Sequence, residues 1–373
     1  MSGGYECAWE DELLQDRLYL NDGKGTFSRA SYQAKNTNNS CVKTFDADGD
    51  GDLDLLVGGG VQPARYPIAD DSQLLINDGK GHFETQALAL GLVADAAVAD
   101  LNRDGRPDLV LVGEWSEPRW IENQPAGLFK NKIEHPMGAG AGWWTRLTAN
   151  DLDNDGDLDF VVGNLGQNNQ LKASTDEPIT LQYADFDQNG TIDPFICYFN
   201  LGRSYPIASR DEALEQVVGL RKKFVDYSSY ATATIEDLFT DDALKKATKL
   251  TITENRSGLL INNAGKFTFE PLPVQAQFAP IYAIEVADVN KDGKKDLILA
   301  GNNANFRIRI GKMDANPGTV VLGNGKNRFE YVAAAKTGLQ LGGDTKDMKR
   351  ITTKRGQILL FFTNNNKLKG YVF

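Results

Sequence analysis

The sequence predicts an all-β fold, a β-propeller of four-stranded blades with a small helical insertion. Two repeated patterns and their spacing are the basis of this prediction. An acidic nine-residue loop occurs five times between short apolar runs, and a glycine-containing turn occurs four times between alternating apolar residues. Each pattern is typical of a β-hairpin. Four-stranded units of roughly 50 residues that repeat along a chain are typical of propellers.

The acidic loop has a nearly constant form. Its first and ninth residues are aspartate, its third and fifth are Asp or Asn, and its sixth is glycine. The five copies are Asp46–Asp54, Asp100–Asp108, Asp151–Asp159, Asp185–Asp193 and Asp288–Asp296. Carboxylates this close together repel one another unless a hard cation lies between them, and calcium takes six to eight oxygen ligands. Glycine permits the sharp turn, because a left-handed backbone is unfavourable for other residues.

We therefore expect up to five structural Ca²⁺ ions, one in each loop. Positions 1, 3, 5 and 9 would supply side-chain oxygens, and position 7 a backbone carbonyl, since its side chain varies from aspartate to lysine. The alternative is a set of acidic turns that cap hairpins without metal. The expected ligands are Asp46, Asp48, Asp50, Asp52, Asp54, Asp100, Asn102, Asp104, Arg106, Asp108, Asp151, Asp153, Asp155, Asp157, Asp159, Asp185, Asp187, Asn189, Thr191, Asp193, Asp288, Asn290, Asp292, Lys294 and Asp296.

The net charge supports this interpretation. The 373 residues carry a formal charge of -11, and 19 of the 51 acidic residues lie in the five loops. Five divalent cations would offset most of that charge. This acidic net charge argues against nucleic-acid binding through an extended basic patch.

The same loops predict where the protein works. Weak calcium sites fill readily outside cells and poorly in cytosol. No stretch is long and apolar enough for an integral membrane segment, and Met1 leads directly into domain-like sequence without a signal peptide. We expect an extracellular, periplasmic or cell-surface protein, and this chain (1–373, one propeller domain) to be a piece of a longer one. Cys7 and Cys41 either form a disulfide or are free thiols.

The order of the hairpins predicts the blades. Residues 17–20 and 26–29 form only the outer half of a first blade, and apolar runs flank each acidic loop after it, such as 41–45 and 55–57. The third and fourth loops are close together, so we expect the unit beginning near Trp143 to have lost or shortened its outer strands. Helical patterns at about 210–247 explain the long step to the fifth loop.

A last unit without an acidic loop follows at 348–352, 357–363 and 367–373. Six units and the leading half give seven blade positions with an incomplete first blade. The alternative is a six-bladed ring in which the first half-blade completes the last one.

The loop and its flanking strands resemble the FG-GAP/VCBS repeat of integrin-α-like propellers. More narrowly, segments 2–4, 15–25, 142–144, 205–211 and 277–282 resemble bacterial cell-envelope VCBS-repeat proteins related to the ASPIC/UnbV group. The resemblance covers essentially the whole chain, except that the first half-blade lacks the usual acidic hairpin. It implies a calcium-stabilised propeller on the outside of the cell, without a settled biochemical activity.

Blade topology separates the acidic loops from the candidate binding residues. In a four-stranded blade both hairpin turns lie on one face, and the longer connections lie on the other. Loops on a rigid scaffold commonly carry binding, and aromatic rings beside arginine suit a sugar or a peptide. The candidate ligand-binding residues are Arg65, Tyr66, Trp115, Trp143, Trp144, Arg146, Tyr205, Arg210 and Tyr282. Alternatively, Trp143 and Trp144 pack inside the fold, and the arginines pair with inner-strand carboxylates.

The chain shows no recognisable catalytic arrangement. His82 lies in a turn and His135 in a loop, and neither belongs to a nucleophile or zinc pattern. We therefore expect a non-enzymatic propeller that binds a glycan or protein partner at the cell envelope. The alternatives are a carbohydrate-active lyase or hydrolase that uses the same face, and a purely structural domain.

Overall fold

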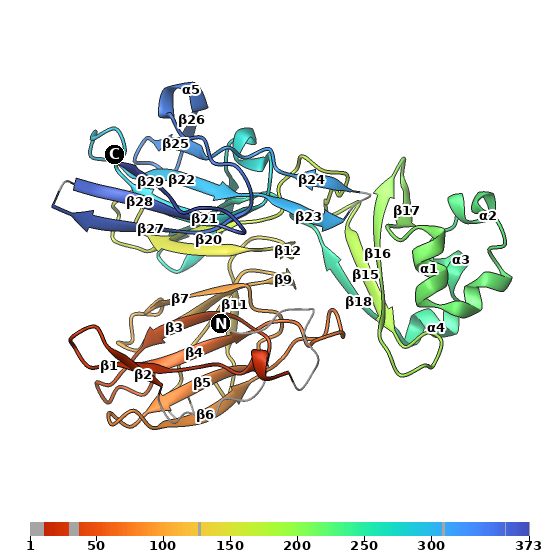
Figure 1. The fold of residues 1–373 in the computed structure, drawn as a ribbon, viewed down its shortest axis with the longest axis horizontal. Coiled ribbons are helices and arrows are strands. Elements are labelled where there is room, and N and C mark those ends of the chain that lie inside the picture. The colour runs from red at the N-terminus through yellow and green to blue at the C-terminus, as the bar shows by residue number, and fades with distance from the viewer. Residues whose placement is uncertain (1–10, 30–36, 126–127, 308–309, 355, 373) are drawn as a thin grey trace. The chain divides into compact units, whose positions relative to one another are not determined.

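The structure is a computed structural model that describes residues 11–29, 37–125, 128–307, 310–354 and 356–372. Within them nearly all regular structure is antiparallel strand, and five of the sheets have four strands (Figure 1). The predicted all-β fold class is therefore confirmed, whereas the number of blades stays a prediction. Two units can be distinguished: the first comprises Met1–Ala94, Gln124–Asn131 and Leu171–Thr253, and the second comprises the other residues.

The first unit begins with the predicted half-blade. Strands β1 (Tyr19–Asn21) and β2 (Phe27–Arg29) pair antiparallel after the short 3-10 helix η1 (Glu12–Leu14). In the next sheet every strand pairs with its successor in the chain. This sheet consists of β3 (Asn39–Phe45), β4 (Asp54–Gly59), β5 (Ser72–Asn77) and β6 (Phe83–Leu88). The acidic loop at Asp46 joins β3 to β4, as the sequence predicts.

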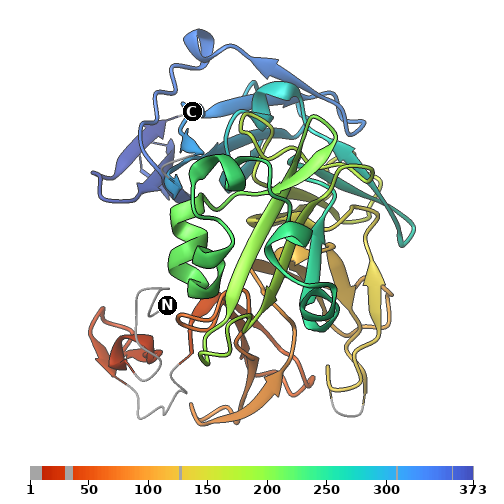
Figure 2. The same ribbon diagram turned by 90° about the vertical axis from the view of Figure 1, so that its right-hand side faces the viewer.

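The first unit also contains the helical segment. Its second four-stranded sheet has the order β17-β16-β15-β18. The strands are β15 (Ile179–Ala184), β16 (Asp193–Asn200), β17 (Arg203–Pro206) and β18 (Thr248–Ile252). The helices between β17 and β18 are α1 (Arg210–Gln216), η2 (Val218–Lys222), α2 (Tyr227–Ala231), α3 (Ile235–Leu238) and α4 (Asp241–Lys246). Their apolar side chains pack on Phe195 and Cys197 of β16, and Figure 2 shows these green helices beside the sheet.

The second unit holds three four-stranded sheets and a three-stranded one. The first is β7 (Asp95–Ala99), β8 (Asp108–Val112), β10 (Arg119–Ile121) and β11 (Glu134–Pro136). The second is β13 (Arg146–Asn150), β14 (Asp159–Gly163), β19 (Gly258–Asn263) and β20 (Lys266–Pro271). The third is β21 (Ile281–Ala287), β22 (Asp296–Gly301), β25 (Thr319–Gly323) and β26 (Phe329–Val332). The last is β27 (Thr345–Thr353), β28 (Gly356–Thr363) and β29 (Lys369–Val372).

Smaller elements connect these sheets. Two strand pairs lie in the connections: β9 (Glu114–Ser116) with β12 (Gly142–Trp143), and β23 (Asn303–Arg307) with β24 (Gly311–Met313). The short helices are η3 (Val274–Gln277) and α5 (Ala334–Thr337). No helix within the described residues is long and apolar enough to cross a membrane. The proposed Cys7–Cys41 bridge lies outside the described residues, because Cys7 is not among them.

The prediction that the unit near Trp143 lost its outer strands is wrong. Strand β14 pairs with β19, which lies beyond the fourth acidic loop in the chain, and β20 completes that sheet. Residues 164–257 are therefore inserted between the second and third strands of one sheet. They carry the fourth loop, its own sheet and all four helices α1–α4. The apolar strand β14 is buried throughout. Its edge opposite β13 therefore needs a hydrogen-bonded strand, and Gly258–Asn263 supplies it.

Alternate residues of the central strands pack into different cores of the second unit. Phe160 and Val162 belong to a cluster shared with the β7–β11 sheet, whereas Val161 belongs to a cluster shared with the β21–β26 sheet. Strand β22 repeats the pattern, since Leu297 faces one cluster and Ile298 the next. Side chains alternate across a strand, so an unbroken apolar run fits a strand that is covered on both faces. The continuous apolar runs beside the acidic loops follow from this packing.

Close packing at the end of β14 gives a test of the fold. A Cβ atom at Gly163 would lie 2.3 Å from the Ile281 carbonyl oxygen, whereas a Cβ at Gly342 would meet no atom within 4 Å. We expect Gly163→Ala to lower the free energy of unfolding by about 1–3 kcal/mol, in the range of overpacked sites. Gly342→Ala is the matched control and should change it by less than about 0.5 kcal/mol. Equal stability of the two variants in denaturant titrations would contradict the close approach of β14 and β21.

Candidate functional site

The ninth aspartate is buried in every acidic loop, and in four loops it connects the loop to another chain segment. Its exposed fraction is 1% or less in all five loops. One carboxylate oxygen accepts the backbone N–H of loop position 2 at 2.7–3.2 Å. In four loops the other oxygen accepts a backbone N–H from the third strand or just after it, and these donors are Asn77, Asn123, Asn262 and Gly323. The sequence predicts that the ninth aspartate is a metal ligand, but it does not indicate the hydrogen bond that connects this residue to the third strand.

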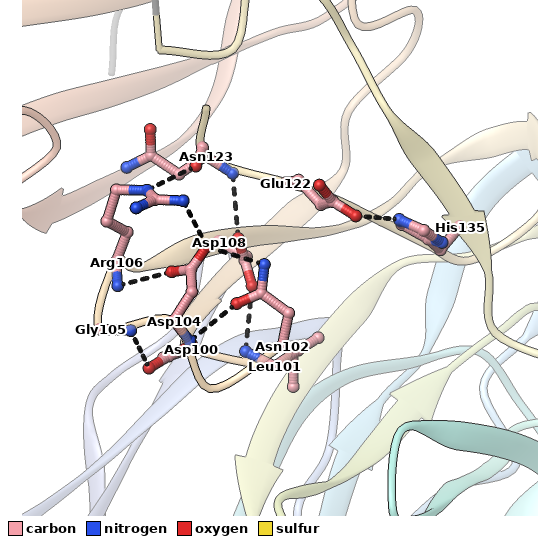
Figure 3. A network of polar contacts seen from close by, with 10 residues as sticks. All are labelled: Asp100, Leu101, Asn102, Asp104, Gly105, Arg106, Asp108, Glu122, Asn123 and His135. Carbon is pink, nitrogen blue, oxygen red and sulfur yellow. Dashed lines mark hydrogen bonds and ion pairs between the residues drawn. The ribbon is translucent and has the colours of Figure 1, made fainter. Parts of the chain in front are cut away.

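The first aspartate is held by the loop backbone. In all five loops it accepts the N–H of the sixth-position glycine at 2.8–3.2 Å. These glycines have φ between 83° and 95°, the left-handed conformation that the sequence predicts. Figure 3 shows the arrangement in the loop that starts at Asp100, where Asp104 also accepts the N–H of Arg106. Backbone hydrogen bonds thus help to orient the acidic side chains.

Three of the loops bring carboxylates close enough together to share one ion. Oxygens of three aspartates lie within 4.8 Å of one another in each of these loops. The sets are Asp46, Asp48 and Asp50; Asp151, Asp153 and Asp159; and Asp185, Asp187 and Asp193. The loops at Asp100 and Asp288 have asparagine at the third position. They therefore offer one carboxylate fewer there, although an amide oxygen is also a suitable ligand for a hard cation.

Two carboxylate oxygens show that the residues fit a bound cation. Asp151 Oδ1 and Asp187 Oδ1 are buried and accept no hydrogen bond within the described residues. A buried polar atom without a partner is unfavourable, and more so when it is charged. Asp151 and Asp187 each belong to one of the clusters of three carboxylates. A divalent cation would coordinate the oxygen and neutralise its neighbours.

The electrostatics of the third loop agree with that inference. Burial raises the pKa of Asp159 to about 6, and the nearby carboxylates of Asp153 and Asp155 add to the increase. Hydrogen bonds from the backbone of Asn262 and Leu152 act in the opposite direction. Burial likewise raises the pKa values of Asp108 and Asp193. In these three loops burial thus disfavours the ionised ninth aspartate, and a nearby cation would favour it.

In two loops the side chain at position 7 attaches the loop to a neighbouring segment. Asp157 accepts the backbone N–H of Ala264 at 2.9 Å, and Arg106 Nε donates to the carbonyl oxygen of Asn123 at 2.9 Å. Ala264 lies in the turn between β19 and β20, and Asn123 follows β10, so both contacts connect the loop to the second hairpin of the same sheet. In the fourth and fifth loops the position-7 side chain contacts a residue of its own loop instead, since Thr191 contacts Asn189 and Lys294 contacts Asp292. The carbonyl at position 7 stays a predicted metal ligand.

Loops of neighbouring sheets in the second unit also contact one another. Arg103 of the second loop forms an ion pair with Asp157 of the third loop. Asn327, in the turn between β25 and β26, donates to Asp153 Oδ2 at 2.8 Å. The third loop is thus held from both neighbouring sheets, which restricts the positions of its carboxylates.

Two of the candidate binding residues come together in the second unit. The rings of Trp115 and Trp143 lie 5.3 Å apart on the paired strands β9 and β12, and Phe306 of β23 packs on Trp143 at 5.6 Å. We call these three residues the aromatic cluster. Trp115 has φ of 59°, an unusual left-handed conformation for a bulky residue. Both tryptophans are nearly buried, with 7% and 8% exposed, whereas Phe306 is half-buried.

The other candidates of the second unit are engaged inside the fold. Trp144 is fully buried in the core between two sheets, so it has no surface for a ligand. Arg146 donates to Asp347 at 2.6 Å and lies 3.4 Å from Asp95, which agrees with the alternative that it pairs with inner-strand carboxylates. The hydroxyl of Tyr282 accepts a hydrogen bond from Asn303 at 3.4 Å, and burial raises the pKa of this tyrosine to about 12.

The remaining candidates lie in the first unit. Arg210 begins helix α1 and donates to the carbonyl oxygens of Phe224 and Val225, so it connects the helices. Arg65 donates to Gln62 at the surface. Tyr205 lies in β17, and Tyr66 precedes a cis proline in the connection between β4 and β5. For each of the nine candidate ligand-binding residues, contact with a ligand stays a prediction.

The role of the ninth aspartate gives a second test. Asp54→Ala leaves the N–H groups of Ala47 and Asn77 without their acceptor, and each buried unpaired group costs about 1–3 kcal/mol. In chelator, we expect this variant to lose about 2–4 kcal/mol of unfolding free energy. Asp50→Ala, which loses one exposed local bond, should lose less than about 1 kcal/mol. Similar losses in urea titrations would show that position 9 has no special structural role.

The comparisons with known proteins agree with the loop geometry. A family model described as FG-GAP-like repeat matches residues 9–57 and 100–162, which contain the first three acidic loops. No curated protein matches the chain. The chain therefore contains FG-GAP-like repeats, and the first three acidic loops lie within them.

Proposed function

We propose that the protein is a calcium-stabilised, propeller-type binding domain that acts outside the cytoplasm. It binds a glycan or protein partner and performs no catalysis. The observation that carries the proposal is the pair of buried, unpartnered carboxylate oxygens, Asp151 Oδ1 and Asp187 Oδ1, inside clusters of three aspartates. They indicate that a cation completes these loops.

The ligand chemistry favours calcium over other cations. The candidate ligands are carboxylate, amide, hydroxyl and carbonyl oxygens, without histidine or cysteine. Zinc and other transition metals prefer nitrogen and sulfur ligands. Magnesium retains several waters and requires a nearly ideal octahedron, whereas calcium accepts more oxygens in flexible geometry.

The calcium sites support a location at the cell surface, in the periplasm or in the extracellular space. Exposed loops of this kind bind calcium most readily where its concentration is high. FG-GAP repeats are typical of extracellular or surface proteins and generally form non-enzymatic domains. The protein would therefore have its full stability only after export.

The aromatic cluster is the best-supported place for a partner. A left-handed tryptophan persists only where the surrounding structure holds it, and such strain often occurs at functional sites. Trp115 lies in a connection and not in a regular sheet of four strands, and connections on a rigid scaffold commonly bind partners. The half-exposed ring of Phe306 at the edge of the cluster is available for contact with a sugar or an apolar side chain.

Calcium binding is tested by thermal unfolding and calorimetry. We expect calcium to raise Tm, because a ligand at about 100 times its Kd adds about 2.7 kcal/mol per site. Magnesium should raise Tm less, and excess chelator should remove the effect. Asp151→Asn should weaken calcium binding at one site, while Asp176→Asn, in an exposed turn outside the five loops, should leave the calorimetric stoichiometry unchanged. An unchanged Tm in calcium and chelator would refute the calcium sites.

Partner binding is tested with a glycan array and with purified envelope proteins. We expect Phe306→Ala to weaken binding about tenfold or more, because an aromatic contact contributes about 1–3 kcal/mol at a binding site. Phe362→Ala removes a ring that is 44% exposed on β28 and should leave binding unchanged. If both variants bind like the parent protein, the aromatic cluster is not the partner site. Turnover of a bound polysaccharide would contradict the non-enzymatic role.

A further inference from the structure

A cleft of about 590 Å³ opens between two neighbouring sheets of the second unit. One wall comes from β10 and β11, the outer strands of the first sheet, and the other from β20 of the second. Its side chains with polar or aromatic groups are Glu117, Trp120, His135, Lys266 and Phe267. The volume lies in the range of small-molecule sites, about 300–1,000 Å³. None of these residues belongs to an acidic loop or to the aromatic cluster.

The first wall is a fixed aromatic surface with a polar edge. Trp120 and His135 are direct partners across strands β10 and β11, and their rings stack at 4.0 Å with an angle of 14°. Glu122 holds His135 Nε2 at 2.7 Å, as Figure 3 shows. With Nε2 engaged by Glu122, Nδ1 is the other ring nitrogen that a ligand could contact. The imidazole of His135 is thus held by the Trp120 ring on its face and by the Glu122 carboxylate at its edge. His82, in contrast, lies in an exposed turn.

The opposite wall leaves space beside these rings. Phe267 is 8% exposed at the base, and Lys266 next to it is exposed. Gly138, Ala139 and Gly140 also line the cleft, so no large side chain from this segment fills it. The backbone of Gly138 comes so near the Phe267 carbonyl that a Cβ atom there would lie 2.7 Å from its oxygen. Small residues therefore keep the cleft open while the two walls remain close at its base.

The two charged side chains of the cleft balance each other. Glu117 is an exposed carboxylate and Lys266 an exposed ammonium group, so the pair has no net charge. A small anion is attracted by Lys266 but repelled by Glu117, and a small cation the reverse, so neither gains a net Coulombic attraction from the pair. A neutral molecule with many hydroxyl groups can use the carboxylate as an acceptor and the ammonium and imidazole as donors or acceptors. Its apolar face can lie on the rings of His135 and Phe267.

We propose that this cleft binds a short neutral saccharide, at a site separate from the aromatic cluster. Glu117 and Lys266 would hydrogen-bond the hydroxyl groups, and His135 would position the ring through Nδ1. Glu122 acts indirectly because it fixes the orientation of the imidazole. This inference does not depend on the proposed partner site or on calcium binding.

The two histidines of the chain provide a direct measurement. His82 and His135 are the only imidazoles, so each can be assigned in an NMR spectrum from His82→Ala and His135→Ala. We would titrate glucose, galactose and N-acetylglucosamine separately, with galacturonate as an anionic comparison. The expected result is a saturable shift of the His135 signals with at least one neutral sugar, unchanged His82 signals, and a weaker response to galacturonate.

Variants at exposed positions distinguish binding from effects on folding. Glu117→Ala and Lys266→Ala should each weaken the sugar affinity about fivefold, as expected for a lost hydrogen bond of about 1 kcal/mol. Lys326→Ala is the matched control, because Lys326 is exposed in the corresponding hairpin of the next sheet. It should leave the affinity unchanged.

Three outcomes would overturn the proposal. The first is that no neutral sugar shifts the His135 signals, and the second is that Lys326→Ala weakens binding as much as Lys266→Ala does. The third is that a sugar shifts tryptophan indole signals and loses affinity in Phe306→Ala while His135 is unaffected. That last result would place the sugar at the aromatic cluster, so it would support the proposed function and reject the cleft.

Discussion

The buried carboxylate at the ninth position of each acidic loop is the constraint on which the rest of the structure depends. In four loops it accepts one backbone N–H from the loop and another from the third strand or its end. One side chain therefore closes the loop and joins the two hairpins of a sheet. For Asp108, Asp159 and Asp193, burial also raises the pKa and so disfavours the charged carboxylate, which makes a nearby cation favourable. Sheet assembly and the proposed metal binding thus involve the same group.

Packing between sheets explains why the loops can be so alike while their surroundings differ. The strands beside the loops are covered on both faces, and alternate residues such as Val161 and Val162 belong to different cores. Packing on both faces holds such strands in place, and this also restricts the loop at one end of the strand. Contacts between loops, such as that of Arg103 with Asp157, restrict the carboxylates further. The connections are freer to vary, and they hold the aromatic cluster.

The repeat pattern in the sequence was sufficient to predict the local structure. It predicted the five loops, the left-handed glycines, the half-blade of β1 and β2, and the three strands of the last sheet. The reason is that hairpin turns and glycine conformations depend on residues close together in the chain. The chemistry of the acidic loops was predictable for the same reason, since their candidate ligands lie within nine residues.

The tertiary structure decided what depends on distant residues. Only the tertiary structure shows that β14 pairs with β19 across the whole insertion. In the sequence, the turns look the same whether one sheet is inserted between the strands of another or follows it along the chain. The tertiary structure also places Trp144 in a core, which the sequence left open. The sequence prediction that His135 lies in a loop is wrong, because His135 belongs to strand β11 and stacks on Trp120 across the strand pair. The sequence by itself determined the repeating unit and its acidic loops. Which strands share a sheet, and which side chains remain accessible, were decided by long-range pairing and packing.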